Sequence, residues 1–338
     1  MIIQTMIIGG ISMNKKVKLF GMAVALSSMV FAAGCGNSSK EASSSEASGE
    51  KGGESVAVVL KTLSSPYWKY VEAGAKAAGE ELGVDVTVVG PSSEAEVIQQ
   101  VNMLEDQVSQ GPGAVVVSPT QPETVVPVLE KAAKDTPVLL IDSDADFEGK
   151  TTFIGTENYS AGQEGGKLLA SMLKKGDKVV LIAGALGNPA TDTRIKGAKE
   201  ALEAAGMEVV AEQPADSDKA KAMSVMENIL QNNKDVKGVF AANDDMAIGA
   251  LRAVEAKGLK DVKVMGVDGT MEAVESILDG KLAASVAQSP YNMGYQGVEN
   301  AVKAMNGEKI EERIDSGIDL ITKENAKEQL DFLKSISK

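Results

Sequence analysis

The stretch VKGVFAANDDMAIGAL, residues 236–251, combines an apolar run, a polar junction and the start of a helical pattern. Residues 236–240 have the apolar character of a strand buried in a parallel sheet. Residues 247–257 follow a helical pattern that ends before Gly258, a common helix terminator. Asn243, Asp244 and Asp245 lie between the two. The stretch therefore predicts one strand–helix unit of an α/β fold.

The same unit recurs along the chain from residue 55 onward. A helical segment such as 198–205, which ends before Gly206, separates one apolar run from the next. Repeated strand–helix units predict parallel sheets with helices on both faces, and the number of strands favours two doubly wound domains over one sheet. The other predicted strands are residues 56–60, 84–89, 114–117, 138–141, 179–182, 209–210, 262–267 and 282–287.

The composition narrows the function classes. The chain has 338 residues, a formal charge of -14 and no visible basic patch, which argues against nucleic acid as a partner. It has no His, so the commonest general base and metal ligand are missing. Its single Cys excludes an intrachain disulfide and a multi-Cys metal site. Carboxylates and lysines could still support catalysis, but we expect no metal, no cofactor and no enzymatic activity.

The N-terminus has the layout of an exported precursor. A basic segment at residues 14–18 precedes an apolar run at 19–33 that is short for a membrane span. The sequence Ala32-Ala33-Gly34-Cys35 resembles a bacterial lipobox, with Ala32 where Leu is usual, and the resemblance implies lipidation of Cys35. The alternative is an incidental thiol in a cleaved peptide. We therefore expect a signal peptide with lipobox at 1–35, starting at Met1 or Met13, and a flexible linker rich in Ser, Glu and Gly at 36–53.

Polar residues follow most of the predicted strands. Doubly wound sheets bind ligands outside the carboxyl ends of their strands, so these positions are candidates for a binding site. Tyr67 and Trp68 follow Pro66 at a helix start, and flat aromatic rings suit the apolar faces of sugar rings. Carboxylates, amides and guanidinium groups can hydrogen-bond sugar hydroxyls. The polar candidates, which suit a small polyol better than a lipid or a metal, are Lys61, Asp142, Arg194, Asn243, Asp268 and Gln288.

Each candidate also has a purely structural interpretation. Asp268 precedes Gly269 and could be a turn residue, and Asn243 and Asp142 could be helix caps. Ser65 before Pro66 is a natural N-cap, and Tyr67 alone suits the core. A single Arg just past a glycine-rich loop, as at Arg194, is the strongest candidate for a bidentate clamp.

Several of these stretches together resemble the ribose-type periplasmic sugar-binding proteins of ABC transporters, and most closely the D-allose-binding branch. The matching stretches are residues 60–68, 213–216, 242–251, 267–270 and 287–288. The resemblance implies the periplasmic binding protein type I fold, with two doubly wound parallel-sheet domains joined by a multi-strand hinge. The implied N-terminal lobe is 54–157 plus 289–317, and the implied C-terminal lobe is 158–288 plus 318–338.

The resemblance also implies the ligand-binding residues. Ribose binders have Asn where Ser65 stands and Arg where Ser143 stands. At the position of Ser217, ribose binders have Phe and allose binders have Trp, so the sugar stays open. The implied set is Ser65, Tyr67, Trp68, Asp142, Arg194, Asn243, Asp268 and Gln288, to which the allose branch adds Lys61.

We therefore expect a monomeric, lipid-anchored solute-binding protein on the outer face of the cytoplasmic membrane. It would capture an allose-like or ribose-like monosaccharide, or a related polyol, and deliver it to an ABC permease. One alternative is a signalling receptor for a furanose-like or polyol ligand. A repressor of the same fold would need a helix-turn-helix where the signal segment stands. A carbohydrate-acting enzyme could use Asp142 and Asp268 as its carboxylate pair, although Arg194 and Gln288 are expected to keep both ionised as acceptors.

Overall fold

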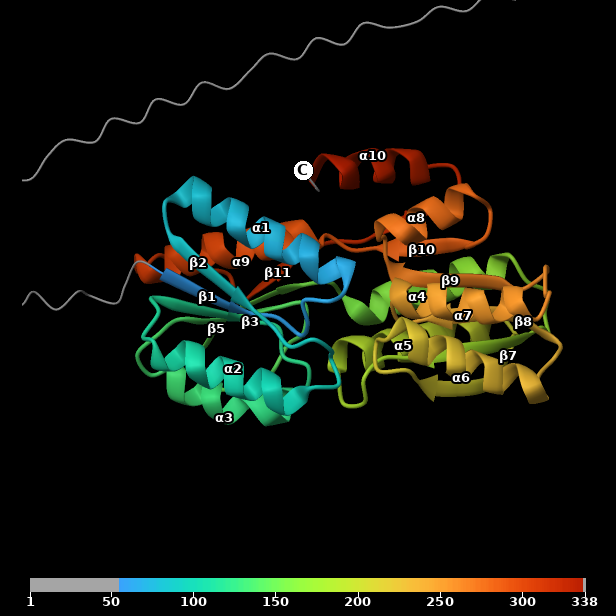
Figure 1. The fold of residues 1–338 in the computed structure, drawn as a ribbon, viewed down its shortest axis with the longest axis horizontal. Coiled ribbons are helices and arrows are strands. Elements are labelled where there is room, and N and C mark those ends of the chain that lie inside the picture. The colour runs from blue at the N-terminus through green and yellow to red at the C-terminus, as the bar shows by residue number, and fades with distance from the viewer. Residues whose placement is uncertain (1–54, 337–338) are drawn as a thin grey trace, which may run out of the picture. The chain divides into compact units, whose positions relative to one another are not determined.

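The computed structural model describes residues 55–336, and the predicted signal peptide, Cys35 and linker lie outside this range. Within it the chain forms two sheets of six strands each, with helices packed against both faces of each sheet (Figure 1). We call the first sheet with its helices the N-terminal lobe and the second sheet with its helices the C-terminal lobe. No helix in the described range is long and apolar enough to cross a membrane.

The sheet of the N-terminal lobe is parallel throughout, in the order β11-β5-β4-β3-β1-β2. The central strands are short apolar runs, as expected where both faces are covered. The strands are β1 (Ser55–Val59), β2 (Asp85–Val89), β3 (Ala114–Val117), β4 (Val138–Ile141), β5 (Lys150–Gly155) and β11 (Arg313–Asp315).

Successive residues of these strands supply two separate cores, because side chains alternate between the faces of a sheet. Val58 and Val116 pack into one core with helices α1 (Pro66–Leu82) and α9 (Pro290–Met305). Val59 and Val117 pack into the other with α2 (Val97–Ser109) and α3 (Pro122–Ala132). Figure 1 shows α1 with α9, and α2 with α3, on opposite sides of this sheet.

The sheet of the C-terminal lobe has the order β12-β10-β9-β8-β6-β7 and is parallel except for the edge pair β10 and β12. The helices around it share one large apolar core. The strands are β6 (Lys178–Ala183), β7 (Glu208–Pro214), β8 (Val236–Ala241), β9 (Lys263–Asp268), β10 (Ala284–Ala287) and β12 (Asp319–Ile321). The helices are α4 (Asn158–Ser171), α5 (Pro189–Ala204), α6 (Lys219–Asn232), α7 (Asp244–Ala256), α8 (Met271–Leu278) and α10 (Ala326–Ile336).

The predicted fold class is confirmed, since both sheets are dominated by parallel pairs and helices alternate with strands. Every apolar run predicted as a strand overlaps an observed strand. Three strands were missed: β5, β11 and β12. Strand β5 begins with Lys150-Thr151-Thr152 and so lacks a continuous apolar run, and the other two are edge strands of three residues each, too short to show a pattern. Such segments adopt strand geometry because a neighbouring strand pairs with them, which is a tertiary effect.

Candidate functional site

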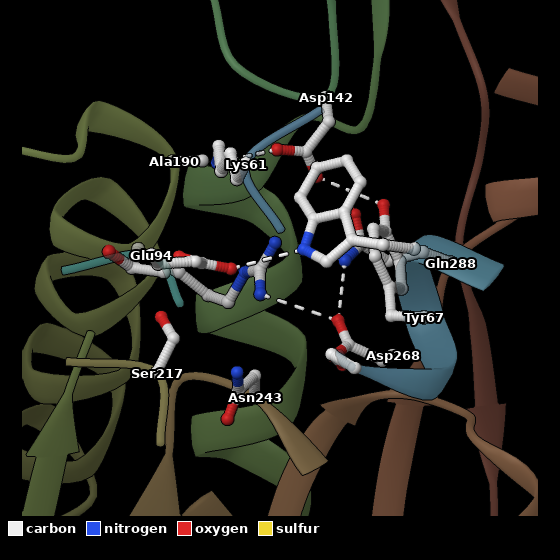
Figure 2. A pocket seen from close by; sticks show the side chains of 13 residues that line it. Lys61, Tyr67, Glu94, Asp142, Ala190, Ser217, Asn243, Asp268 and Gln288 are labelled. Atoms are coloured by element: carbon white, nitrogen blue, oxygen red, sulfur yellow. Dashed lines mark hydrogen bonds and ion pairs between the residues drawn. The ribbon is translucent and has the colours of Figure 1, made fainter. Parts of the chain in front are cut away.

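All nine predicted ligand residues line one cavity (Figure 2). Both lobes contribute to the wall, mainly through residues at the carboxyl ends of strands and the starts of helices, where doubly wound sheets place ligands. The lining residues are Lys61, Ser65, Tyr67, Trp68, Glu94, Asp142, Ala190, Thr191, Arg194, Ser217, Asn243, Asp268 and Gln288.

A buried ion pair anchors the N-terminal-lobe side of the cavity. Lys61 Nζ lies 2.7 Å from Asp142 Oδ2 and donates a second bond of 2.6 Å to Ser143 Oγ. The hydroxyl of Tyr67 donates to Asp142 Oδ1 at 2.9 Å. Asp142 has a φ of 61°, in the left-handed region that costs free energy for every residue other than Gly, although Asn and Asp tolerate it best. The chain thus accepts a strained backbone at the position where its carboxylate meets Lys61 and Tyr67.

This network sets the ionisation of its members. Burial alone would raise the pKa of Asp142, but the Lys61 ammonium, the Arg194 guanidinium and the Tyr67 hydroxyl outweigh it and hold the pKa below its ordinary value. Burial and the neighbouring carboxylates of Asp142 and Asp268 raise the pKa of Tyr67 well above its ordinary value. At neutral pH the cavity therefore presents the Asp142 carboxylate beside the neutral phenol of Tyr67.

Tyr67 and Trp68 belong both to the cavity wall and to the core of the N-terminal lobe. Their rings meet edge to face, with centroids 5.0 Å apart and an interplanar angle of 86°. The Trp68 indole donates a 3.1 Å hydrogen bond to Glu94 Oε1, and the Lys61 ammonium lies 5.5 Å from the Trp68 ring centroid. Tyr67 and Trp68 can therefore be core residues and cavity residues at once, because the packed pair also borders the cavity.

Arg194 is placed by close packing between α4 and α5. A Cβ atom at Gly162 would lie 1.9 Å from the carbonyl oxygen of Arg194, so only glycine allows the two helices to approach this closely. The guanidinium then donates to Asn158 Oδ1 from Nε at 3.2 Å and from Nη2 at 2.7 Å, and from Nη1 to the carbonyl of Ala242 at 2.5 Å. These bonds fix the orientation of the guanidinium at the cavity wall.

Asp268 and Gln288 form a hydrogen-bonded pair in another part of the cavity wall. Gln288 Nε2 donates to Asp268 Oδ1 at 2.7 Å, and Arg194 Nη1 lies 3.7 Å from the same oxygen. Asp268 has a φ of 128°, a second strained backbone at the site. Burial raises the pKa of Asp268 well above its ordinary value, although the Arg194 guanidinium opposes the shift. Arg194 thus contributes to the lowered pKa of Asp142, where Lys61 has the larger lowering effect, whereas burial outweighs Arg194 and Gln288 at Asp268. That Arg194 and Gln288 keep both aspartates ionised stays a prediction.

Ser65 and Asn243 stand at the N-cap positions of α1 and α7. Asn243 does cap, since its side chain accepts the backbone N–H of Met246 at 2.8 Å. The side chain of Ser65 makes no capping bond and instead donates to Asp245 Oδ2 of the other lobe at 2.6 Å. Ser65 is therefore a lobe-to-lobe contact at the cavity rim.

The cavity is also lined by Glu94, Ala190 and Thr191, which the sequence analysis missed, and by Ser217, which it named only as the position of an aromatic residue in ribose and allose binders. Glu94 comes five residues after the end of β2, beyond the positions directly following the strand, and Ala190 and Thr191 lie in the first turn of α5. Reading each loop as far as the next helix would have included Glu94. Ser217 has a φ of 57°, which places it in a tight turn before α6. Within the described residues no cluster of His, Cys, Asp and Glu could hold a metal ion.

The fold and this polar, aromatic-walled cavity between two lobes define the class of protein. The family described as "periplasmic binding protein domain" matches residues 56–309, and the chain belongs to it. The ribose import binding protein of Escherichia coli strain K12 is 33% identical over 272 residues, which cover 80% of this chain and 91% of that protein. The D-allose-binding periplasmic protein of the same strain is 33% identical over 265 residues, covering 75% and 85%.

Among solved structures, a carbohydrate transporter solute binding protein from Agrobacterium radiobacter, in complex with D-arabinose, superposes with a TM-score of 0.79. It is 32% identical, and the match covers 85% of this chain and 99% of that one. The predicted resemblance to ribose-type sugar-binding proteins of ABC transporters is therefore confirmed. The relatives are substrate-binding proteins and not enzymes, and those named for ribose and for allose are equally identical to this chain.

Proposed function

We propose that this protein captures a monosaccharide or related polyol in the cavity between its lobes and delivers it to an ABC import permease. The observation that carries the proposal is the convergence of all nine predicted ligand residues on one cavity. Two perpendicular aromatic rings provide apolar surface, and two carboxyl groups, an amide and a guanidinium provide hydrogen-bond partners for hydroxyl groups. The relatives named for ribose, allose and arabinose support the sugar class.

The proposed lobes are residues 54–157 plus 289–317 and residues 158–288 plus 318–338. Contacts across the cavity favour a hinge that closes around the ligand. Ser65 Oγ donates to Asp245 Oδ2 at 2.6 Å, and Gln121 Nε2 donates to the carbonyl of Leu186 at 3.0 Å. Both bonds join a residue of the N-terminal lobe to one of the C-terminal lobe, so they would break on opening.

The protein would act as a monomer, without a metal or cofactor, and lipidation of Cys35 would hold it at the outer face of the cytoplasmic membrane. It would not be an enzyme. Asp142, a candidate for a catalytic pair, has its two oxygens bonded to Lys61 and Tyr67, which suits an anchored acceptor and not an attacking nucleophile.

The test is a thermal-shift screen of monosaccharides and polyols, followed by calorimetry on the best ligand. We expect one-to-one binding with an upward shift of the melting temperature, and recovery of the ligand chemically unchanged after prolonged incubation. Failure of every monosaccharide and polyol to bind would contradict the proposed function, and conversion of the bound sugar would contradict its non-enzymatic part.

A further inference from the structure

Glu94 is a buried carboxylate at the cavity that none of the predicted contacts explains. It is only 9% exposed and comes from the loop between β2 and α2 of the N-terminal lobe. Its Oε1 accepts the indole N–H of Trp68 at 3.1 Å. An ionised carboxylate can accept about four hydrogen bonds, so this single bond leaves acceptor capacity facing the cavity. Burial of such a group is costly unless further donors reach it.

Ser217 faces the same part of the cavity from the other lobe. Its Oγ is buried and has no hydrogen-bond partner among the described residues. The hydroxyl nevertheless lies close enough to act on Glu94 as a hydrogen-bond donor that lowers the pKa of that carboxyl, although burial raises it more. A buried hydroxyl with no well-formed hydrogen bond is rare and needs an explanation, such as a ligand group that completes its bonding.

Glu94 and Ser217 lie away from the polar residues Asp268, Gln288 and Tyr67 of the site. Figure 2 shows Glu94 and Ser217 on one side of the pocket, and Asp268, Gln288 and Tyr67 on the opposite side. The residues on that opposite side already bond to protein partners, Gln288 to Asp268 and Tyr67 to Asp142. The Glu94 side therefore offers bonding capacity that is separate from that of Asp268 and Gln288.

We propose that Glu94 and Ser217 form a subsite for one hydroxyl group of the bound polyol, which donates to Glu94 and accepts from Ser217. This inference rests on the proposed function and adds a specificity device to it. A site built to hydrogen-bond a hydroxyl rejects the analogue that lacks it, because the buried polar groups are then left unpaired. Since the two residues come from different lobes, the subsite is complete only when the lobes are closed.

The test is a cycle between protein variants and ligand analogues. The monosaccharide that binds most tightly is compared with each of its monodeoxy analogues on the wild type, Glu94→Gln and Ser217→Ala, with dissociation constants measured by calorimetry. We expect one particular deoxy position to weaken binding to the wild type at least tenfold. The same deletion should change binding to Glu94→Gln and Ser217→Ala by less than about threefold, because the partner group is already altered.

Glu96→Gln is the matched control, since Glu96 is two residues away in the same loop and exposed. It should reproduce the wild-type pattern at every deoxy position. Glu94 also positions Trp68, but a loss of positioning alone would weaken all analogues by a similar factor. A uniform loss, or no coupling to any hydroxyl, would overturn the subsite while leaving sugar binding intact. A wild type that binds no monosaccharide or polyol would overturn both proposals.

Discussion

Lys61 Nζ lies 2.7 Å from Asp142 Oδ2, although the two residues are separated by 81 positions in the sequence. Lys61 follows β1 and Asp142 follows β4, and the parallel sheet brings the carboxyl ends of both strands to one edge. Both side chains are at least 95% buried in this structure. The pair belongs to a single lobe, so it supports the shape of that lobe whether or not the cavity is closed.

Removing one partner of this pair is expected to destabilise the N-terminal lobe. In Lys61→Met the Asp142 carboxylate stays buried without its cation, and we expect a loss of about 3 kcal/mol in the free energy of unfolding. Urea unfolding of the ligand-free protein measures it. Lys69→Met is the control, because Lys69 forms an exposed pair with Glu72 and should change stability by less than about 1 kcal/mol. Equal effects of the two substitutions would show that the buried pair has no special role.

Asp244 should make stability depend on pH. It is fully buried at the start of α7, and burial raises its pKa to about 7 against the hydrogen bonds from Ser285 and Thr270. The folded protein then keeps a proton that the unfolded chain, with a pKa of about 3.9, releases. The protonated Asp244 therefore contributes to the free energy of unfolding below pH of about 4. This contribution is lost as the pH rises to about 7, by at most about 1.4 kcal/mol per pH unit.

Urea unfolding between those pH values, for the wild type and Asp244→Asn, measures this contribution. Between pH of about 4 and about 7, the unfolding free energy of the wild type should fall relative to that of Asp244→Asn. Above pH of about 7, the two curves should run parallel. Asp279→Asn, at an exposed position, should follow the wild type throughout. Parallel curves for the wild type and Asp244→Asn would mean that Asp244 is ionised in the folded protein across the whole range.

Arg194→Ala is expected to weaken sugar binding with the fold retained. It removes a guanidinium that Asn158 and Ala242 hold at the cavity wall. Loss of a charge-assisted bond of about 1.5–3 kcal/mol raises the dissociation constant roughly tenfold to hundredfold. Calorimetry with the best ligand tests this, with Arg252→Ala as the control because Arg252 is half exposed and paired with Glu272. Unchanged affinity in Arg194→Ala would make Arg194 a purely structural residue.

The single Trp provides a direct report on the cavity. Trp68 is 3% exposed, borders the cavity and bonds to Glu94, so ligand contact should change its surroundings. We expect intrinsic emission to change on titration with ligand, along a curve that gives the calorimetric dissociation constant. Because Trp68 is also part of the core, Trp68→Ala should lose both affinity and about 3 kcal/mol or more of stability. Emission that does not respond to a saturating, calorimetrically proven ligand would place the ligand away from Trp68.

Cys35→Ser tests the proposed membrane anchor. Two or more acyl chains hold a protein stably at a membrane, whereas none leaves it to diffuse away. In an exporting bacterial host the wild type should fractionate with membranes, and the variant should appear as released protein or as uncleaved precursor. Fully processed Cys35→Ser protein that stays with the membranes would show that another attachment holds it.

Much of this architecture is encoded locally and can be predicted without coordinates. The apolar run 114–117 is β3 to the residue, and Pro66 and Gly83 bound α1 as an N1 proline and a left-handed C-cap. Periodicity and turn chemistry act over a few residues, so they survive in the sequence alone. Parallel strands place their carboxyl ends at one edge of the sheet, so the order of strands and helices indicates which loops lie together. The candidate residues were predicted from their positions in these loops.

The tertiary structure decided the bonding and charge of those residues. Whether Ser65 caps its helix or crosses to Asp245, and whether Asp268 is held ionised by Arg194, depends on distances of a few ångströms between distant segments. The burial that raises the pKa of Asp268 likewise depends on segments that are distant in the sequence. Strand β5 and the apposition of Glu94 with Ser217 have no local signature, because each depends on a neighbour supplied by the folded chain.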